Sequence, residues 1–152
     1  MMSRSGYHDE VLNQFDVTSW RGQVASALRG KRGQKLLLDL VHGLDAMPEK
    51  RLISEQLQCA DGMCALGVVG ARRGIDLQFL NPTDNDDYGE DKTAQVAGLL
   101  DIADQLALEI VHINDEHGRA NETPEQRWKR VRKWAAMNIN YVFEDLPEEP
   151  TT

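Results

Sequence analysis

The chain has 152 residues, 41% of them apolar and 6% aromatic, which fits one domain with a mainly aliphatic core. Two cysteines are too few for a disulfide framework. No apolar stretch approaches the roughly 20 residues that cross a bilayer, and residues 1–16 lack the apolar segment of a secretory signal. We therefore expect a cytoplasmic location, where thiols stay reduced.

The formal net charge of −8 is concentrated in two places. One cluster is Asp84, Asp86, Asp87, Glu90 and Asp91, and the other is Glu144, Asp145, Glu148 and Glu149. These nine are taken from 25 acids, so 16 acids face 17 bases elsewhere. A protein that mimics nucleic acid would need acidic residues along one folded face. This arrangement predicts instead that the chain outside the two acidic clusters is nearly neutral.

Helical spacing begins at Trp20, with Ser19 as its predicted N-cap and Gly30 as its stop. A short basic link follows over residues 29–35. A second helix is predicted from about residue 34 to 47, ended by Pro48 because the residue before proline avoids α geometry. Its buried stripe is Leu37, Leu40, Val41 and Leu44.

The dipeptide Asp61-Gly62 is a turn signal with two interpretations. It could close a small hairpin of residues 53–57 against 63–66, or lead directly into a helix. We favour a helix over about 63–73, closed by Gly74. Gly67 and Gly70 would weaken that helix but let another backbone approach closely.

An irregular segment over residues 77–92 precedes a long helix that Thr93 is predicted to cap. Its apolar face is Val96, Leu99, Leu100, Ala103, Leu106, Ile110 and Ile113. After a polar loop, Thr123 to Gln126 form a capping box with proline at the first helical position. That last helix should run to about residue 138, with Trp128, Val131 and Ala135 facing inward and a short extended segment at 141–143.

These elements predict a mainly α, compact domain of about five helices with at most a small β-hairpin. We expect a flexible segment over residues 1–17, one helical domain over 18–143 with an acidic loop at 81–92, and an acidic flexible tail over 144–152. A homodimer is compatible with long helices that carry apolar faces.

Two patterns suggest metals. Asp39 with His42, and Glu109 with His112, repeat the acid-x-x-His spacing of di-metal helical bundles, but the sequence does not identify the two further inward carboxylates that such a site needs. Cys59 and Cys64 are five positions apart, and zinc knuckles use such a cysteine pair together with a second ligand pair, but no second pair with tight spacing accompanies them. We therefore expect solvated or capping side chains, half-buried cysteines, no metal and no cofactor.

The basic feature of the chain lies on the last helix and consists of Arg127, Lys129, Arg130, Arg132 and Lys133, interleaved with Trp128 and Trp134. One interpretation is a contact with phosphates or with an acidic protein. The other is a solvated face balanced by the acids of the chain itself. No serine, cysteine or lysine lies in a recognisable nucleophile context, so we expect no catalytic residue and no enzyme activity.

Four stretches carry a resemblance: residues 20–24 (WRGQV), 47–52 (MPEKRL), 64–67 (CALG) and 122–128 (ETPEQRW). On these, across about residues 18–138, the chain resembles a group of small bacteriophage and prophage proteins that have no assigned activity. The resemblance implies a phage accessory protein in a bacterial host. Small acidic accessory proteins of this type are often stoichiometric binders that block a host machine, and inhibitors of CRISPR–Cas complexes are one such class.

Our first functional hypothesis is therefore a non-enzymatic inhibitor of a host protein or protein–nucleic-acid complex. It would contact a basic groove through the acidic loop at Asp84, Asp86, Asp87, Glu90 and Asp91. The alternative is a nucleic-acid-binding accessory protein that uses the basic helix 125–138.

Overall fold

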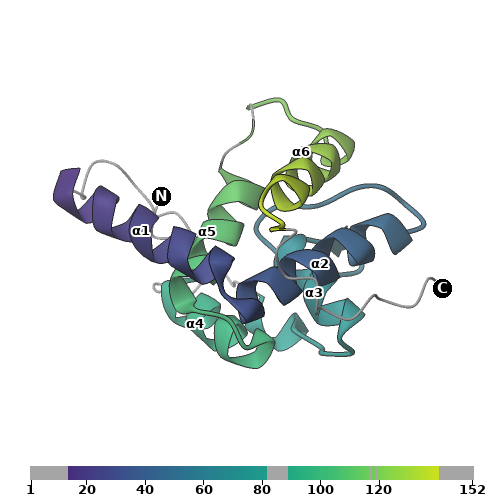
Figure 1. Cartoon of the computed structure of the whole chain (residues 1–152). Helices are drawn as coiled ribbons and strands as arrows, with labels where there is room; N and C mark the ends of the chain where they lie inside the picture. Colours follow the sequence, from purple (N-terminus) through teal and green to yellow (C-terminus); the bar gives the residue numbers. More distant parts are fainter. Residues whose placement is uncertain (1–13, 82–88, 117, 119, 141–152) are drawn as a thin grey trace.

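The computed structural model describes residues 14–81, 89–116, 118 and 120–140 (Figure 1). Within them the chain is mainly α, as the sequence predicts, with six α-helices and one two-stranded antiparallel hairpin. The elements are α1 (Gln14–Arg29), α2 (Lys31–Ala46), β1 (Gln58–Cys59), β2 (Gly62–Met63), α3 (Ala65–Arg72), the 3-10 turn η1 (Gln78–Leu80), α4 (Gly89–Leu100), α5 (Asp104–Asp115) and α6 (Pro124–Met137). The predicted extended segment at 141–143 and the acidic tail lie outside the described residues.

The first helix begins earlier than predicted. Because α1 starts at Gln14, Ser19 lies inside it and is not its N-cap, which corrects the prediction. The expected link over 29–35 is also wrong, since only Gly30 separates α1 from α2. Gly30 has extended backbone angles, φ −73° and ψ 163°, and serves as the N-cap residue of α2. One extended residue is therefore enough to turn the chain from one helix into the next.

The structure contains both elements that the Asp61-Gly62 turn suggests, first a hairpin and then a helix. The turn closes a hairpin in which Gln58 pairs with Met63 and Cys59 with Gly62, and α3 begins two residues later. The strands are shorter and nearer the turn than 53–57 and 63–66. Gly62 has φ +142°, a conformation that favours glycine.

The single long helix predicted from Thr93 to Ile113 is wrong, because the chain breaks between α4 and α5. Asp101 takes the left-handed conformation with φ +55°. The Ile102 amide donates to Ala97 O at 3.0 Å and the Asp101 amide to Gly98 O at 3.3 Å, the hydrogen bonds of a Schellman motif. Thr93 is buried inside α4 rather than at its start, and Leu99, predicted to face inward, is 46% exposed.

The core is aliphatic, as the composition indicates, and α2 lies at its centre (Figure 1). Helix α2 packs against α1, α3 and α6, and α5 packs against α1, α3, α4 and α6. The fully buried leucines are Leu36, Leu37, Leu40, Leu44, Leu52, Leu66, Leu77, Leu100 and Leu106. None of the helices in the described ranges is both long and apolar enough to cross a membrane.

Candidate interaction surface

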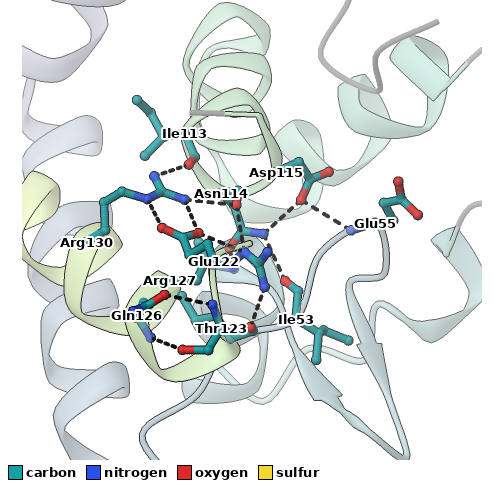
Figure 2. A network of polar contacts seen from close by, with 12 residues as sticks. Ile53, Glu55, Ile113, Asn114, Asp115, Glu122, Thr123, Gln126, Arg127 and Arg130 are labelled. Carbon is teal, nitrogen blue, oxygen red and sulfur yellow. Dashed lines mark hydrogen bonds and ion pairs between the residues drawn. The ribbon is translucent and has the colours of Figure 1, made fainter. Parts of the chain in front are cut away.

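The predicted capping box starts α6 and lies next to a network of polar contacts (Figure 2). The Thr123 hydroxyl accepts from the Gln126 amide at 3.1 Å, and the Gln126 side chain accepts from the Thr123 amide at 2.9 Å. This geometry confirms the helix start that the sequence predicts. It fixes the direction in which the following arginines leave the first turns of α6.

Two of the predicted nucleic-acid-binding residues point into the protein (Figure 2). Arg130 donates to both carboxylate oxygens of Glu122, at 2.6 and 2.9 Å, and also to Ile113 O. Arg127 donates to Asn114 O at 3.1 Å and to Leu52 O at 3.0 Å. Both guanidinium groups therefore satisfy carbonyl groups at the carboxyl end of α5, where the helix dipole favours a positive charge.

The remaining basic residues of α6 divide between an ion pair and solvent. Arg132 donates to both oxygens of Asp45, at 2.6 and 2.9 Å, and this hydrogen-bonded pair lowers the pKa of Asp45 and raises that of Arg132. Lys129 and Lys133 are exposed. Three of the five predicted phosphate contacts are thus held by acceptors of the chain itself.

The two acid-x-x-His pairs do not meet. Asp39 is 3% exposed and accepts from Arg73 at 2.7 Å. Glu109 accepts from the Trp20 indole at 3.5 Å, and His112 Nδ1 lies 2.7 Å from Glu116. In the part of the chain that the structure describes, no three His, Cys, Asp or Glu side chains are grouped to hold a metal ion.

A buried glutamine joins the hairpin to α3 and to the segment after it. Gln58 is 7% exposed, and its amide oxygen accepts from the Leu77 amide at 2.8 Å. Its amide nitrogen donates to Gly67 O at 2.9 Å and to Ile75 O at 3.3 Å.

The segment before β1 packs closely against α3 at Gly67, where an added Cβ would lie 1.8 Å from Leu57 O. The predicted role of this glycine in close packing is confirmed.

Asn81 holds the end of η1 against the same strand. Its side chain accepts from the Leu57 and Gln58 amides, at 2.6 and 3.3 Å, and donates to Gln58 O at 2.7 Å. Its backbone oxygen accepts from Lys92 Nζ at 3.2 Å. The two residues that flank segment 82–91 are therefore hydrogen-bonded to each other, and one of them, Asn81, is also hydrogen-bonded to Gln58 of β1.

The predicted acidic contact residues belong to that flanked segment. Asp84, Asp86 and Asp87 lie outside the described residues. Glu90 and Asp91 belong to the α4 helix, so the predicted acidic loop over 81–92 ends in a helix. Within the described part, the surface next to Asn81 includes Phe79 of η1, whose side chain is 69% exposed.

A pocket of about 580 Å³ lies between the hairpin and the turn that follows α3. Cys59 is half-buried in its wall, whereas Cys64 is 1% exposed, so both match the prediction of core or half-buried thiols. The pocket is lined by Glu49, Gln58, Cys59, Ala60, Asp61, Gly62, Met63, Ala71, Gly74, Ile75, Asp76 and Gln78. This set contains three acids and no base.

The sequence interpretation did not find Gln58, Asn81 or Asn114, whose side chains form hydrogen bonds with backbone groups of distant segments. Asn114 is 1% exposed, accepts from the Ala65 amide at 3.0 Å and donates to Ile53 O at 2.9 Å. The only sequence signal is an uncharged amide beside apolar residues, such as Leu57 before Gln58. That signal does not say which distant backbone group the amide will meet.

No family model matches the chain, and no curated protein or solved structure shows significant similarity to it. The described residues define a small, mainly α domain, and the lining of its pocket contains three acids.

Proposed function

We propose that this chain is a non-enzymatic accessory protein of phage origin, acting in the cytoplasm of a bacterial host. It binds a basic surface of a host protein complex and inhibits it. Nucleic-acid-binding defence complexes, including CRISPR–Cas effectors, are the target class, because their nucleic-acid channels are positively charged. The phage origin rests on the resemblance in residues 18–138 alone.

The observation that carries this proposal is the closure of the acidic segment at its base. Asn81 O accepts from Lys92 Nζ at 3.2 Å, and Asn81 is itself fixed to β1. Five acids follow in the sequence between Asn81 and Lys92, at 84, 86, 87, 90 and 91, the last two in α4. Tying the ends of a segment together reduces the conformational entropy that it loses on binding. Clustered charge of one sign also accelerates association with a basic partner.

The distribution of positive charge supports the same function over its alternative. Arg127, Arg130 and Arg132 are held by carbonyl and carboxylate oxygens of this chain. A nucleic-acid-binding function of helix 125–138 would depend mainly on Lys129 and Lys133, and two phosphate contacts give weak binding.

The test compares tagged wild-type protein with a variant in which Asp84, Asp86, Asp87 and Asp91 become Asn and Glu90 becomes Gln. Both are used to capture complexes from bacteria with an active CRISPR–Cas system, with quantitative mass spectrometry as the readout. The matched control neutralises the tail acids Glu144, Asp145, Glu148 and Glu149. We expect the loop variant to lose a host complex that the control retains. Equal recovery by all three proteins contradicts the proposal, and so does the absence of any complex.

A further inference from the structure

A single residue separates the two long helices at the α1–α2 junction, and its conformation differs from a helical one in only one torsion angle. Gly30 has φ −73°, near the helical value of about −63°, whereas its ψ of 163° is extended and a helix has about −42°. Rotation of that one ψ angle would join residues 14–29 and 31–46 into one continuous helix. Because glycine passes between these conformations without a Cβ to obstruct it, Gly30 is suited to serve as a hinge.

The closed form, in which the chain is bent at Gly30, contains two contacts that a continuous helix would lack. At Gly33 an added Cβ would lie 2.1 Å from Ala27 O, so an alanine there requires the backbone to shift. In a continuous helix residues 27 and 33 would lie about 9 Å apart along the axis. Gln34, which is 1% exposed, donates to Leu28 O at 2.5 Å, a carbonyl that would accept from the amide of residue 32 in a continuous helix.

The backbone at the start of α2 favours opening of the hinge. Because glycine has no side chain, Gly30 cannot cap α2 as Ser or Asp would, and residues 31–34 include no acid. The first amides of a helix have no acceptor inside it. In a continuous helix the amides of residues 31–33 would donate to the carbonyls of residues 27–29. Straightening therefore gains backbone hydrogen bonds, and the packing of α1 on the rest of the fold opposes it.

Opening would expose two faces of one chain that fit each other. Helix α1 packs on α5 (Figure 1), where the Trp20 indole donates to Glu109 at 3.5 Å and Val24 is 7% exposed. When α1 leaves α5, its inner face and the face of α5 that it covered both lose their partner. A second copy in the same form presents the same two faces. Two chains can therefore restore the contact twice, around a two-fold axis.

We propose that this protein forms a dimer by exchange of α1, with Gly30 as the hinge and Gly33 as the residue that favours the closed monomer. Because the α1–α5 contacts are the same in both forms, the hinge region and the entropy of association distinguish the dimer from the monomer. The dimer fraction therefore rises with protein concentration and responds to substitutions at the hinge. This exchange goes beyond the proposed function and does not depend on what the acidic segment binds.

Three glycine-to-alanine variants of the full chain separate the hinge from general effects on stability. Gly33→Ala introduces a clash with Ala27 that belongs to the closed form alone. Gly30→Ala makes ordinary contacts in the closed form, the nearest at 3.6 Å, and favours the helical backbone of the open form. Gly22→Ala is the control, because residue 22 lies inside α1 in both forms and its added Cβ meets no atom of the described chain within 4 Å.

Size-exclusion chromatography with light scattering over a concentration series measures the dimer fraction of each variant. Circular dichroism shows that the variant remains helical. We expect Gly33→Ala and Gly30→Ala each to raise the association constant of the dimer by about tenfold or more, since every dimer contains two hinges. Gly22→Ala should leave the association constant unchanged.

A distance measurement distinguishes exchange of α1 from an ordinary dimer. Spin labels are attached at the exposed positions Gln23 of α1 and Ala46 of α2, through ketone-bearing amino acids so that Cys59 and Cys64 are retained. Labelled protein is diluted with unlabelled protein, so that only distances within one chain are measured. In the open form the two positions lie about 35 Å apart along one helix, at about 1.5 Å per residue. In the closed form they are nearer, because the chain bends at Gly30.

The Gly30→Ala variant decides the outcome even if Gly33→Ala fails to fold, because its added Cβ causes no clash. A Gly30→Ala dimer with the longer distance supports the proposal. Gly30→Ala that stays monomeric at every concentration overturns it, and so does a dimer that keeps the shorter distance. An equal rise in dimer fraction for Gly22→Ala also overturns it, since that would not depend on the hinge.

Discussion

Arg130 and Glu122 form a two-fold hydrogen-bonded ion pair, with Nε to Oε2 at 2.6 Å and Nη2 to Oε1 at 2.9 Å. The carboxylate side chain is 8% exposed, so water screens the pair only partly. The two partners are eight positions apart, and the pair joins the residue before the N-cap of α6 to the second turn of that helix, next to the end of α5. A residue predicted to contact phosphate thus has a structural partner.

The hydrogen bond from Arg130 lowers the pKa of Glu122 below its ordinary value of 4.5. Because the folded-state pKa is depressed, the ionised carboxylate stabilises the fold above about pH 4.5, and this stabilisation is lost as pH falls through the folded pKa. We expect Glu122→Gln to cost about 2 kcal/mol at pH 7. The cost should shrink steadily below pH 4.5. Urea unfolding from pH 7 to pH 3 measures it, and a pH-independent cost contradicts the assignment.

Two glycines should respond in opposite directions to alanine. At Gly67 the new Cβ would lie 1.8 Å from Leu57 O, a backbone atom that cannot move aside easily, so Gly67→Ala should destabilise by about 3 kcal/mol. At Gly98, inside α4, nothing lies within 4 Å, so Gly98→Ala should stabilise by about 1 kcal/mol. Chemical unfolding of the two variants checks both values. A destabilising Gly98→Ala would show that the surface of α4 is packed in solution.

Asn81→Ala removes three hydrogen bonds, one to Leu57 and two to Gln58 of β1, and leaves the Leu57 amide without its acceptor. We expect a loss of about 2 kcal/mol in the free energy of unfolding. Amide hydrogen exchange at residues 57 and 58 should accelerate more than exchange in α2. Asn121→Ala, at an exposed position, is the control and should change neither quantity. Unchanged exchange at 57 and 58 would contradict the anchoring role.

The break between α4 and α5 depends on the left-handed backbone of Asp101. Glycine adopts this conformation freely and alanine does not, so Asp101→Gly should be more stable than Asp101→Ala by about 1 kcal/mol. Both variants lose the exposed Arg32 ion pair equally, so it cancels in the comparison. Thermal unfolding of the two variants measures the difference. If the alanine variant is the more stable, the break is not set by this residue.

The alternative function has its own test. We expect no binding of labelled DNA or RNA by fluorescence anisotropy at about 50 mM salt, where phosphate contacts are strong. Micromolar binding that weakens steeply with salt, and that Lys129→Glu with Lys133→Glu abolishes, would favour the nucleic-acid hypothesis instead. Arg130→Glu is unsuitable for this purpose, because it would break the Glu122 pair and destabilise the fold.

Local patterns determined the elements whose signals lie within a few residues. The Thr123 capping box, the end of α3 before Gly74 and the leucine stripe of α2 are all visible in the sequence and confirmed in the structure. In each case one short-range preference, a cap, a positive φ or a helical period, is sufficient. The mainly α class follows from the sum of such preferences.

Tertiary structure decided what local signals leave open. The break at Asp101 went unpredicted because aspartate, unlike glycine, does not by itself indicate a left-handed residue. The direction of Arg130 depended on where Glu122 and the end of α5 would lie, and the pocket on how the hairpin meets the turn after α3. Periodicity indicates which face of a helix is buried, but only the packing of distant elements decides which partner each charge will find.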